Sequence, residues 1–405
     1  MEESLAELAE LATSAGAQVV GQAMQTRPAP EAATLVGYGK VEELRAQAAS
    51  ERADVLIFDH DLTPTQQRNL EKAIDCKVID RTQLILDIFA SRARTREGRM
   101  QVELAQLSYL LPRLTGHGAQ MSRLGGGIGT RGPGETKLET DRRRIAQRIK
   151  KIKDDLEGVR AGRALHRQRR SAVPLATLAL AGYTNAGKST LFNRLTRAGV
   201  LADARMFATL DPTVRPLTLP SRRRVLLSDT VGFIRSLPTT VVQAFRATLE
   251  EVKEAALVLH VVDASAPAAA ENVAHVLEVL GEIDAAEIPQ ILVMNKVDRM
   301  EGAAADTEAV RRRLLSGSPG HADERAVAIS ALTGEGIDGL LQAIDEILPL
   351  DPIVRTTVHL PAGDGATLAM LHEFGRVISI QYNESGAEIE AEIPQSLERR
   401  LAAKD

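Results

Sequence analysis

The sequence predicts a multidomain protein of the α/β class, and three observations predict it. Short β-branched runs alternate with helical patterns in two separate parts of the chain. One apolar run, residues 175–181, leads directly into GYTNAGKS, which is typical of a phosphate-binding P-loop between a strand and a helix. The 405 residues are too many for a single core. We therefore expect a P-loop domain that is preceded by a smaller α/β domain and a helical hairpin and followed by a small α+β domain.

Composition limits the environment of the chain. Apolar residues make up 44% and charged residues 26%, and 50 basic residues stand against 54 acidic ones. Cys76 is the only cysteine, which excludes an intrachain disulfide and a thiolate metal cluster. The N-terminus is acidic, and no apolar run of about 18 residues occurs, so neither a signal peptide nor a membrane span is expected. We expect a cytoplasmic monomer without stable membrane association.

Residues 1–99 are expected to form the first domain. Its expected strands are residues 18–21, 34–36, 55–58 and 77–79, and its expected helices are residues 41–50, 64–74 and 81–91. This alternation predicts a parallel sheet. Cys76 is interpreted as a small core residue.

Residues 100–171 are expected to hold a helix at 100–114, a glycine-rich loop and a second helix. The loop, residues 125–134, has six glycines in ten positions, and we interpret it as an ordered or ligand-binding loop. From Glu135 onward the apolar residues follow heptad spacing, which requires a partner helix. An antiparallel hairpin with residues 100–114 is therefore predicted. The apolar stripe consists of Leu138, Ile145, Ile149, Ile152, Leu156 and Val159.

The second helix of this hairpin is strongly basic. Between Arg142 and Arg170, twelve Lys and Arg residues stand against three acidic ones, a local net charge of +9. Most charge runs are solvated helix faces. A surplus this one-sided, beside a glycine-rich loop, favours contact with the phosphate backbone of a nucleic acid.

Residues 172–349 are the expected P-loop domain, and residues 350–405 are the expected C-terminal domain. The strands of the P-loop domain are predicted at 175–181, 225–228, 257–262, 290–294 and 326–329. Pro349 and Pro352 mark the break between the two domains. The C-terminal elements are predicted in the order β, α, β, β, α, at residues 354–360, 363–374, 377–381, 387–393 and 394–402.

The P-loop supplies groups for phosphate and Mg²⁺. Gly182 and Gly187 allow the backbone to approach a phosphate closely, so that successive N–H groups can point at it. Lys188 places a positive charge at the β- and γ-oxygens, and the Ser189 hydroxyl is suited to Mg²⁺. The loop is completed by Tyr183, Thr184, Asn185 and Ala186.

Two further segments are expected to sense the γ-phosphate. Asp229, Thr230, Val231 and Gly232 follow the strand at 225–228; Asp229 is suited to hold a Mg²⁺-bound water, and the Gly232 N–H can meet the γ-phosphate. Residues 207–215, FATLDPTVR, form a polar loop between this motif and the P-loop. In it Thr209 is favoured as a Mg²⁺ ligand, and Thr213 is the alternative.

Base recognition is assigned to Asn295, Lys296, Val297 and Asp298. The Asp298 carboxylate can accept from both N1–H and the 2-amino group of guanine, which adenine lacks, and such sites discriminate by roughly 10⁴ or more. Lys296 can lay its stem along the base, and Asn295 can tie its loop to the P-loop. The last strand is followed by Ser330, Ala331 and Leu332, whose backbone N–H groups could reach the guanine O6. Together and in this order along the chain, the P-loop and the segments that follow it predict a protein that hydrolyses GTP.

Phe233 directly follows Gly232, where many small GTPases carry a glutamine that orients the attacking water. A phenyl ring cannot orient water. We therefore expect slow intrinsic hydrolysis that a partner accelerates. A packing role for Phe233 is compatible with this expectation.

The chain resembles the bacterial HflX GTPases over almost its whole length. The resemblance is carried by VGYGKVEEL (residues 36–44), FDHDLTPTQQRNLE (58–71), VIDRTQLILDIFASRARTREG (78–98), GGGIGTRGPGETKLETDRR (125–143) and the motifs GYTNAGKSTLFN, FATLDPT, DTVGFI and NKVD. It implies a GTPase that binds the large ribosomal subunit near the peptidyl transferase centre. It also implies separation of stalled or idle ribosomes into subunits, particularly under stress.

The same resemblance implies where the ligands bind. Mg²⁺ would lie on Ser189 and Thr209, and the basic hairpin with its glycine-rich loop would face ribosomal RNA. Nucleotide contacts would fall on residues 182–189, 229–232, 295–298 and 330–332 and on Phe207, Ala208, Thr209, Leu210 and Asp211.

Two other functions remain open at this point. One is a nucleotide-gated scaffold whose GTP state selects a protein partner without RNA. The other is an RNA-remodelling enzyme with a second nucleotide site at Gly37, Gly39 and Lys40. These residues lack P-loop spacing, so a turn at the end of a strand is favoured there.

Overall fold

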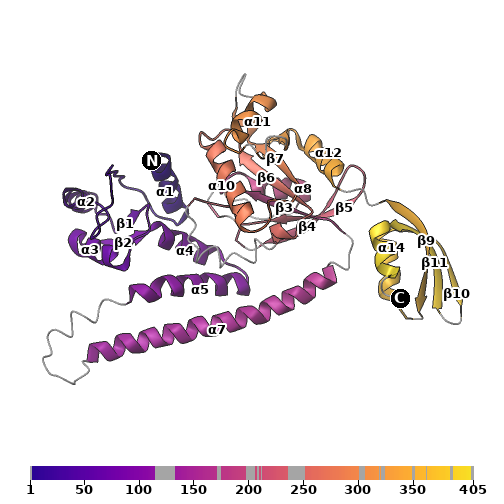
Figure 1. Cartoon of the computed structure of the whole chain (residues 1–405), viewed down its shortest axis with the longest axis horizontal. Coiled ribbons are helices and arrows are strands. Elements are labelled where there is room, and N and C mark those ends of the chain that lie inside the picture. Colours follow the sequence, from indigo (N-terminus) through magenta and orange to yellow (C-terminus); the bar gives the residue numbers. More distant parts are fainter. Residues whose placement is uncertain are drawn as a thin grey trace.

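The structure is a computed structural model with three groups of elements and a long helical hairpin beneath the first two of them (Figure 1). Among its described residues no helix combines the length and the apolarity that crossing a membrane requires. The described residues are 2–114, 133–170, 175–197, 206–207, 209–210, 212–235, 251–300, 306–318, 320, 324–348, 352–361, 363–383 and 386–402.

The N-terminal group contains four helices around a two-stranded parallel sheet. Thr63 and Gln66 cap each other at the start of α3, where Pro64 occupies the first turn, so this helix begins as the sequence predicts. The elements are α1 (Glu2–Ser14), α2 (Tyr38–Glu51), β1 (Val55–Phe58), α3 (Pro64–Ile74), β2 (Lys77–Asp80) and α4 (Arg81–Arg92). Cys76 is half-buried against this core, as expected.

The strands predicted at residues 18–21 and 34–36 are wrong. Val19 and Val20 remain 40% and 48% exposed, so the first segment buries no sheet face. In the second segment Leu35 has a φ of 66°, and its backbone exchanges two hydrogen bonds of 2.9 Å with Glu31. This closes a turn, which β-branched composition alone does not reveal.

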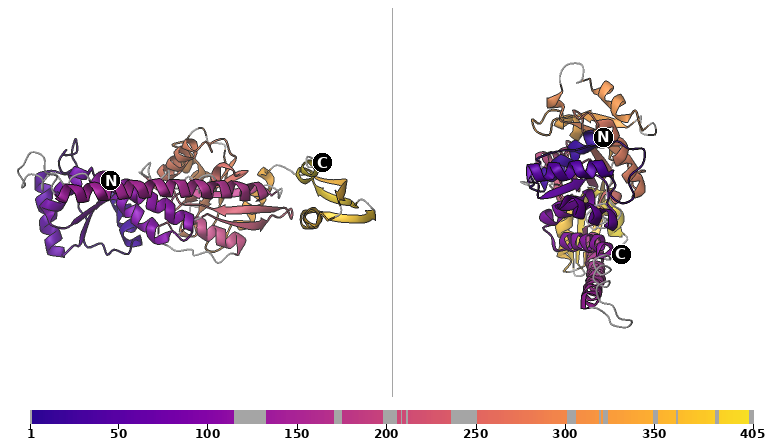
Figure 2. Two further views of the ribbon diagram at one scale, coloured as in Figure 1. Left: turned by 90° about the horizontal axis from the view of Figure 1, so that it is seen from below. Right: turned by 90° about the vertical axis from the view of Figure 1, so that its left-hand side faces the viewer.

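The predicted hairpin is formed by α5 (Arg96–Arg113) and α7 (Pro133–Arg170). Met100 packs against Ile152 and Leu156 of the heptad stripe, and Arg148 binds Glu103 through two hydrogen bonds of 2.7 and 2.8 Å. Helix α7 runs beneath both the N-terminal group and the central sheet (Figure 2). The glycine-rich loop lies outside the described residues except Pro133 and Gly134, which begin α7.

The central group is built on a six-stranded sheet of order β4-β5-β3-β6-β7-β8, in which only β4 is antiparallel to its neighbour. The sequence did not predict β4, because its segment reads as a polar loop; it is an edge strand, where Pro216 costs no hydrogen bond to a second neighbour. The strands are β3 (Thr177–Gly182), β4 (Thr213–Thr218), β5 (Arg224–Asp229), β6 (Leu257–Asp263), β7 (Gln290–Asn295) and β8 (Arg325–Ala328).

Helices cover both faces of this sheet. Leu178 and Leu180 of β3 point to the face that α8 (Lys188–Thr196) and α12 (Ile337–Ile347) cover. Ala179 and Ala181 point to the other face, which is covered by α10 (Ala269–Glu282) and, further along, α11 (Thr307–Leu315). This alternation is the two-residue period of a buried strand.

The C-terminal group has its own core and follows the predicted order. An antiparallel sheet of order β10-β11-β9 packs Ile389, Ala391 and Ile393 against Leu371 and Leu397 of two helices. The elements are β9 (Ile353–Pro361), α13 (Gly365–Phe374), β10 (Arg376–Asn383), β11 (Gly386–Pro394) and α14 (Gln395–Ala402).

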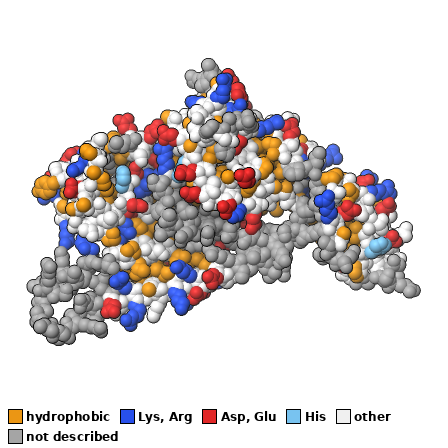
Figure 3. Space-filling view, viewed as in Figure 1, with side chains coloured by type: hydrophobic (Ala, Val, Ile, Leu, Met, Phe, Trp, Pro, Cys, Tyr) orange, Lys and Arg blue, Asp and Glu red, His pale blue; other side chains and the backbone are white. Residues whose placement is uncertain are grey.

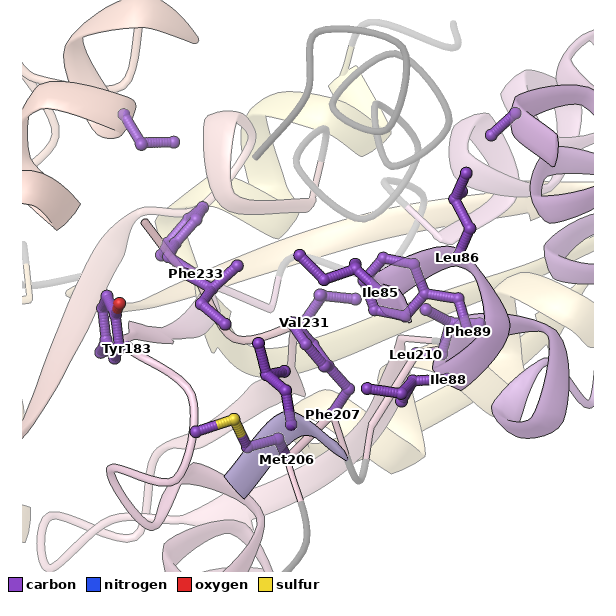
Figure 4. Close-up of a cluster of buried hydrophobic side chains, with 14 of the residues drawn as sticks. Ile85, Leu86, Ile88, Phe89, Tyr183, Met206, Phe207, Leu210, Val231 and Phe233 are labelled. Carbon is purple, nitrogen blue, oxygen red and sulfur yellow. The ribbon is translucent and has the colours of Figure 1, made fainter. Parts of the chain in front are cut away.

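The N-terminal group and the central sheet share one hydrophobic core, which we call the interdomain cluster. The Phe89 ring of α4 meets Phe207 edge to face at 4.6 Å between centroids, and the Ser14 hydroxyl accepts a hydrogen bond of 3.0 Å from the Met206 N–H (Figure 4). The segments that follow the P-loop helix and β5 are thus buried by α1 and α4. The cluster comprises Leu8, Leu11, Ile85, Ile88, Phe89, Tyr183, Met206, Phe207, Leu210, Val231, Phe233, Ile234 and their neighbours.

Replacing Phe89 by alanine should lower the free energy of unfolding by about 3–5 kcal/mol, because a fully buried aromatic ring is lost and its cavity remains. Chemical denaturation followed by circular dichroism measures this loss. Leu110→Ala on α5, where the side chain is 42% exposed, is the control and should cost little. Equal effects of the two substitutions would contradict the packing described for Phe89.

Candidate nucleotide and metal site

A pocket of about 300 Å³ opens at the carboxyl ends of the central strands. Fourteen residues assigned from the sequence line it, and Thr190 and Arg299 join them. The fourteen are Thr184, Asn185, Gly187, Lys188, Ser189, Phe207, Thr209, Thr230, Gly232, Asn295, Lys296, Asp298, Ala331 and Leu332.

Other assigned residues lie around the pocket without lining it. The side chains of Tyr183, Leu210 and Val231 belong to the interdomain cluster, and Ser330 is fully buried, where its hydroxyl accepts from the Thr333 N–H. Ala208 and Asp211 lie outside the described residues. The other residues that were assigned from the sequence and do not line the pocket are Gly182, Ala186, Asp229 and Val297.

Two glycines allow the P-loop to follow its path. Gly187 has a φ of 96°, and a Cβ there would lie 2.2 Å from the Asn295 Nδ2. Gly182 has a φ of 148°, and its Cβ would lie 2.2 Å from the Val261 carbonyl oxygen of β6. A side chain at Gly187 would therefore displace the Asn295 amide, and one at Gly182 would displace the backbone of β6.

Lys188 is buried at the base of the pocket. Its Nζ donates hydrogen bonds to the Gly182 and Tyr183 carbonyl oxygens, at 3.1 and 2.8 Å. Burial lowers the pKa of Lys188 to about 8, although the nearby Asp229 carboxylate opposes the shift. The cation is thus held without a fully compensating anion, which suits it to bind phosphate oxygens.

Three oxygen-bearing side chains meet at the side of the pocket. Thr209 Oγ1 lies 2.8 Å from Ser189 Oγ and 2.8 Å from Asp229 Oδ2, and Ser189 Oγ also lies 2.8 Å from that oxygen. Burial raises the pKa of Asp229, and its Oδ1 has no hydrogen-bond partner among the described residues. Thr213, the alternative to Thr209, instead begins β4 and pairs with the Asp229 backbone.

This donor set fits a hard divalent cation. Mg²⁺ prefers oxygen ligands, and a cation would compensate the buried carboxylate that the protein alone leaves partly unsatisfied. The hydroxyls of Ser189 and Thr209 come from different segments, so a metal held by both would fix the segment of Thr209 against the P-loop.

Asn295 joins three loops of the site. Its buried amide donates to the Ala186 carbonyl oxygen at 2.8 Å and accepts from the Ala331 N–H at 2.9 Å. The tie to the P-loop is the one that the sequence predicts. The Ala331 N–H is consequently already engaged, and it is not free for the guanine O6.

The base-recognition groups lie at the mouth of the pocket. Asp298 is exposed within the short 3₁₀ helix Val297–Arg299, and none of the described residues donates a hydrogen bond to it. Lys296 has a φ of 65° and is held by a hydrogen bond of 2.6 Å from its Nζ to Asp263 Oδ2. The acceptor for guanine is therefore open to a ligand, while the lysine stem beside it is fixed.

Sequence reasoning missed two supporting residues. Arg194 of α8 donates to the Ala331 carbonyl oxygen at 3.2 Å and to that of Leu332, so it holds the last loop of the site. Asp263, at the end of β6, binds Lys296 and also the Ser265 hydroxyl. The position of Asp263 at a strand end was a usable signal; nothing in the sequence marks Arg194.

Five family models match successive, partly overlapping parts of the chain. Residues 2–90 match "GTP-binding GTPase N-terminal", 92–170 match "GTP-binding GTPase Middle Region", and 177–296 match "50S ribosome-binding GTPase". Residues 245–350 match "Elongation factor Tu GTP binding domain", and 319–404 match "HflX C-terminal domain".

Relatives called GTPase HflX match almost the entire chain. That of Caldanaerobacter subterraneus is 47% identical over 99% of this chain and 90% of its own length, and that of Escherichia coli K12 is 44% identical over 100% and 92%. Among solved structures, a GTP-binding protein of Sulfolobus solfataricus in complex with GDP is similar, with 25% identity, a TM-score of 0.47 and coverage of 86% and 96%.

Asn295→Ala should weaken the binding of both GTP and GDP by about 10- to 100-fold, because it leaves a buried carbonyl and a buried N–H without partners. Titration calorimetry with GDP measures the loss directly. Asn272→Ala on α10, away from the pocket, is the matched control. Unchanged affinity in the Asn295 variant would show that the three loops hold together without this amide.

The shifted Lys188 pKa predicts a pH dependence. A free lysine with a pKa of about 8 loses its proton above that pH, whereas phosphate binding needs the charged form, so GDP binding should take up a fraction of a proton at pH 8. The affinity should fall by about fourfold from pH 7 to pH 8.5. Calorimetry in two buffers of different ionisation enthalpy measures the uptake.

Lys188→Arg is the control, since guanidinium stays charged throughout this range. This variant should bind more weakly but without proton uptake. The same uptake in both proteins would assign the titration to another group.

Proposed function

The chain belongs to the HflX family of GTPases, and from this membership we propose that it binds the large ribosomal subunit and separates stalled or idle ribosomes in a GTP-dependent manner. The family assignment rests on matches over the full length of the chain at 42–49% identity. As a GTPase, the protein hydrolyses GTP to GDP and phosphate.

We propose that catalysis depends on holding the nucleotide in position and on positive charge beside its phosphates. Ser189 and Thr209 would hold Mg²⁺, which when bound would supply positive charge to neutralise the phosphates. Lys188 at the pocket base adds a second positive charge, and the Gly232 N–H donates to the γ-phosphate. Support comes from the meeting of the Ser189, Thr209 and Asp229 oxygens and from the position of Gly232, where a Cβ would lie 2.9 Å from Lys188 Nζ.

Hydrolysis by the free protein is proposed to be slow. Phe233 is buried in the interdomain cluster and does not line the pocket, so its ring neither polarises water nor reaches the nucleotide. The polar group that orients the attacking water must come from the backbone nearby or from a partner. The ribosome is the proposed partner.

The proposal that the chain binds the ribosome rests on the exposed basic side chains of α7. Of its described side chains, Arg142, Arg143, Lys150, Lys151 and Lys153 point to solvent, while Ile152 and Leu156 face α5. Figure 3 shows Lys and Arg side chains on this hairpin below the rest of the molecule. Exposed cations along one long helix suit the phosphate backbone of ribosomal RNA.

A second nucleotide site in the N-terminal group has less support. Gly37 and Gly39 flank the start of α2, and the Lys40 Nζ lies 2.7 Å from Glu43, within the same helix. Nothing there repeats the constellation of the pocket described above. The scaffold alternative, a GTP-gated protein partner without RNA, is separated by the experiment that follows.

Replacing Arg143, Lys150 and Lys151 by glutamine should weaken binding to purified large subunits. The slope of the logarithm of the binding constant against the logarithm of the salt concentration should become shallower by about two to three, one for each lost phosphate contact. Sedimentation with a non-hydrolysable GTP analogue measures binding and the conversion of ribosomes to subunits together. The wild-type protein should bind and separate ribosomes with the analogue but not with GDP.

The matched control replaces Arg45, Arg52 and Arg376, which are exposed elsewhere, by glutamine. It should behave as the wild type. Failure of the wild-type protein to sediment with large subunits would favour the scaffold alternative. Full-length variants are needed, because deleting residues 1–170 would uncover the interdomain cluster.

A further inference from the structure

Tyr183 belongs to the P-loop, but its side chain serves another purpose than nucleotide contact. It is buried in the interdomain cluster and does not line the nucleotide pocket (Figure 4). Its hydroxyl donates a hydrogen bond of 2.9 Å to Glu7 Oε2 of α1 and accepts one of 3.0 Å from the Arg235 N–H. One hydroxyl therefore joins the P-loop, the N-terminal helix and the segment that follows Gly232.

The direction of these hydrogen bonds is fixed by chemistry. Burial, together with the Glu7 charge, raises the pKa of Tyr183, so its hydroxyl keeps its proton at neutral pH. The proton goes to the carboxylate, which can only accept, and the oxygen lone pair is left for the backbone N–H.

Glu7 is itself held in place from the N-terminal side. Arg81, the first residue of α4, binds Glu7 through one guanidinium nitrogen and Asp59 Oδ1 through another, at 2.7 Å for the latter. The Arg81 side chain is only 4% exposed, so this arrangement is shielded from solvent. The acceptor offered to Tyr183 is thus rigid rather than a mobile surface carboxylate.

The segment that Tyr183 holds is also tied to the P-loop backbone. The Phe233 N–H donates to the Gly182 carbonyl oxygen at 3.0 Å, and its carbonyl oxygen accepts from the Thr184 N–H at 2.7 Å. At the end of this segment, the Arg235 side chain donates a hydrogen bond of 2.7 Å to Glu271 of α10. The Tyr183–Arg235 hydrogen bond adds the link to the N-terminal group.

We propose that Tyr183 is a positioning residue for GTP hydrolysis, which fixes residues 232–235 against the P-loop and makes their position depend on Glu7 of the N-terminal group. This inference rests on the proposed function, in which Phe233 cannot orient water and the Gly232 N–H donates to the γ-phosphate, so that the reaction depends on the backbone of this segment. The Tyr183 hydroxyl holds that backbone two residues beyond Phe233. The N-terminal group therefore acts on the reaction without touching the nucleotide.

Tyr183→Phe tests this proposal with a minimal change, since the ring and its packing are kept. The typical net value of one hydrogen bond predicts that kcat for GTP falls by about 3- to 10-fold in the full-length protein. The GDP affinity should stay within about twofold of the wild type, because the side chain does not line the pocket. Tyr109→Phe removes another buried phenol hydroxyl, from α5, and should leave kcat unchanged.

A double-mutant cycle separates positioning from general destabilisation. Glu7→Gln should lower kcat in the wild-type background, but in the Tyr183→Phe background the same change should have little further effect, because the link is already broken. Glu10→Gln, on the exposed side of α1, is the charge-matched control and should be silent in both. Thermal unfolding of each variant records any loss of stability.

Non-additive losses in kcat with unchanged GDP affinity support the proposal. Any of these outcomes overturns it: an unchanged or increased kcat in Tyr183→Phe, additive effects of the two substitutions, or a loss of GDP affinity equal to the loss in kcat. A fall in kcat that follows the melting temperature in all variants, Tyr109→Phe included, also overturns it.

Discussion

The structure depends on the burial of both segments that are proposed to sense the γ-phosphate, in a core that they share with the N-terminal group. Phe207 lies two positions before Thr209 in the chain and packs on Phe89, and Phe233 follows Gly232 and lies in the same cluster. Each buried aromatic side chain contributes about 1.5–3 kcal/mol through removal from water. Thr209 and Gly232, which are proposed to meet the metal and the γ-phosphate, thus each lie within two positions of a residue that anchors the N-terminal group.

This arrangement explains features that look unrelated. Ala179 and Ala181 are the small residues of β3 on the face of the interdomain cluster, whereas the opposite face carries leucines. Phe233 stands where many small GTPases carry a glutamine, and its side chain lies in the shared core and does not line the nucleotide pocket. In the same way, Tyr183 in the P-loop reaches α1 instead of the phosphates. Two side chains of the site, Tyr183 and Phe233, therefore contact the N-terminal group and not the nucleotide pocket.

Much of the central and C-terminal fold could be predicted, because buried strands and amphipathic helices leave a clear period. In the N-terminal group, the helix that begins at Pro64 was also predicted. The sequence also predicts Thr209 over Thr213, and the structure brings Thr209 to Ser189 and Asp229. It does not predict β4 or the turn at Leu35, which depend on edge position and backbone angle. The contacts of Tyr183 with Glu7 and of Arg194 with the last loop join residues more than 130 positions apart, and no local pattern encodes such pairs.

Hydrogen exchange of the N-terminal helices in the two nucleotide states tests the shared core most directly. If Thr209 and Gly232 hold the γ-phosphate, then Phe207 and Phe233 are held in the interdomain cluster, and amides of α1 and α4 should exchange more slowly with a non-hydrolysable GTP analogue than with GDP. The exchange of α13 and α14, which have a separate core, should be the same in both states. Identical exchange of α1 and α4 with the two nucleotides would contradict the account, because the N-terminal group would then not respond to the γ-phosphate.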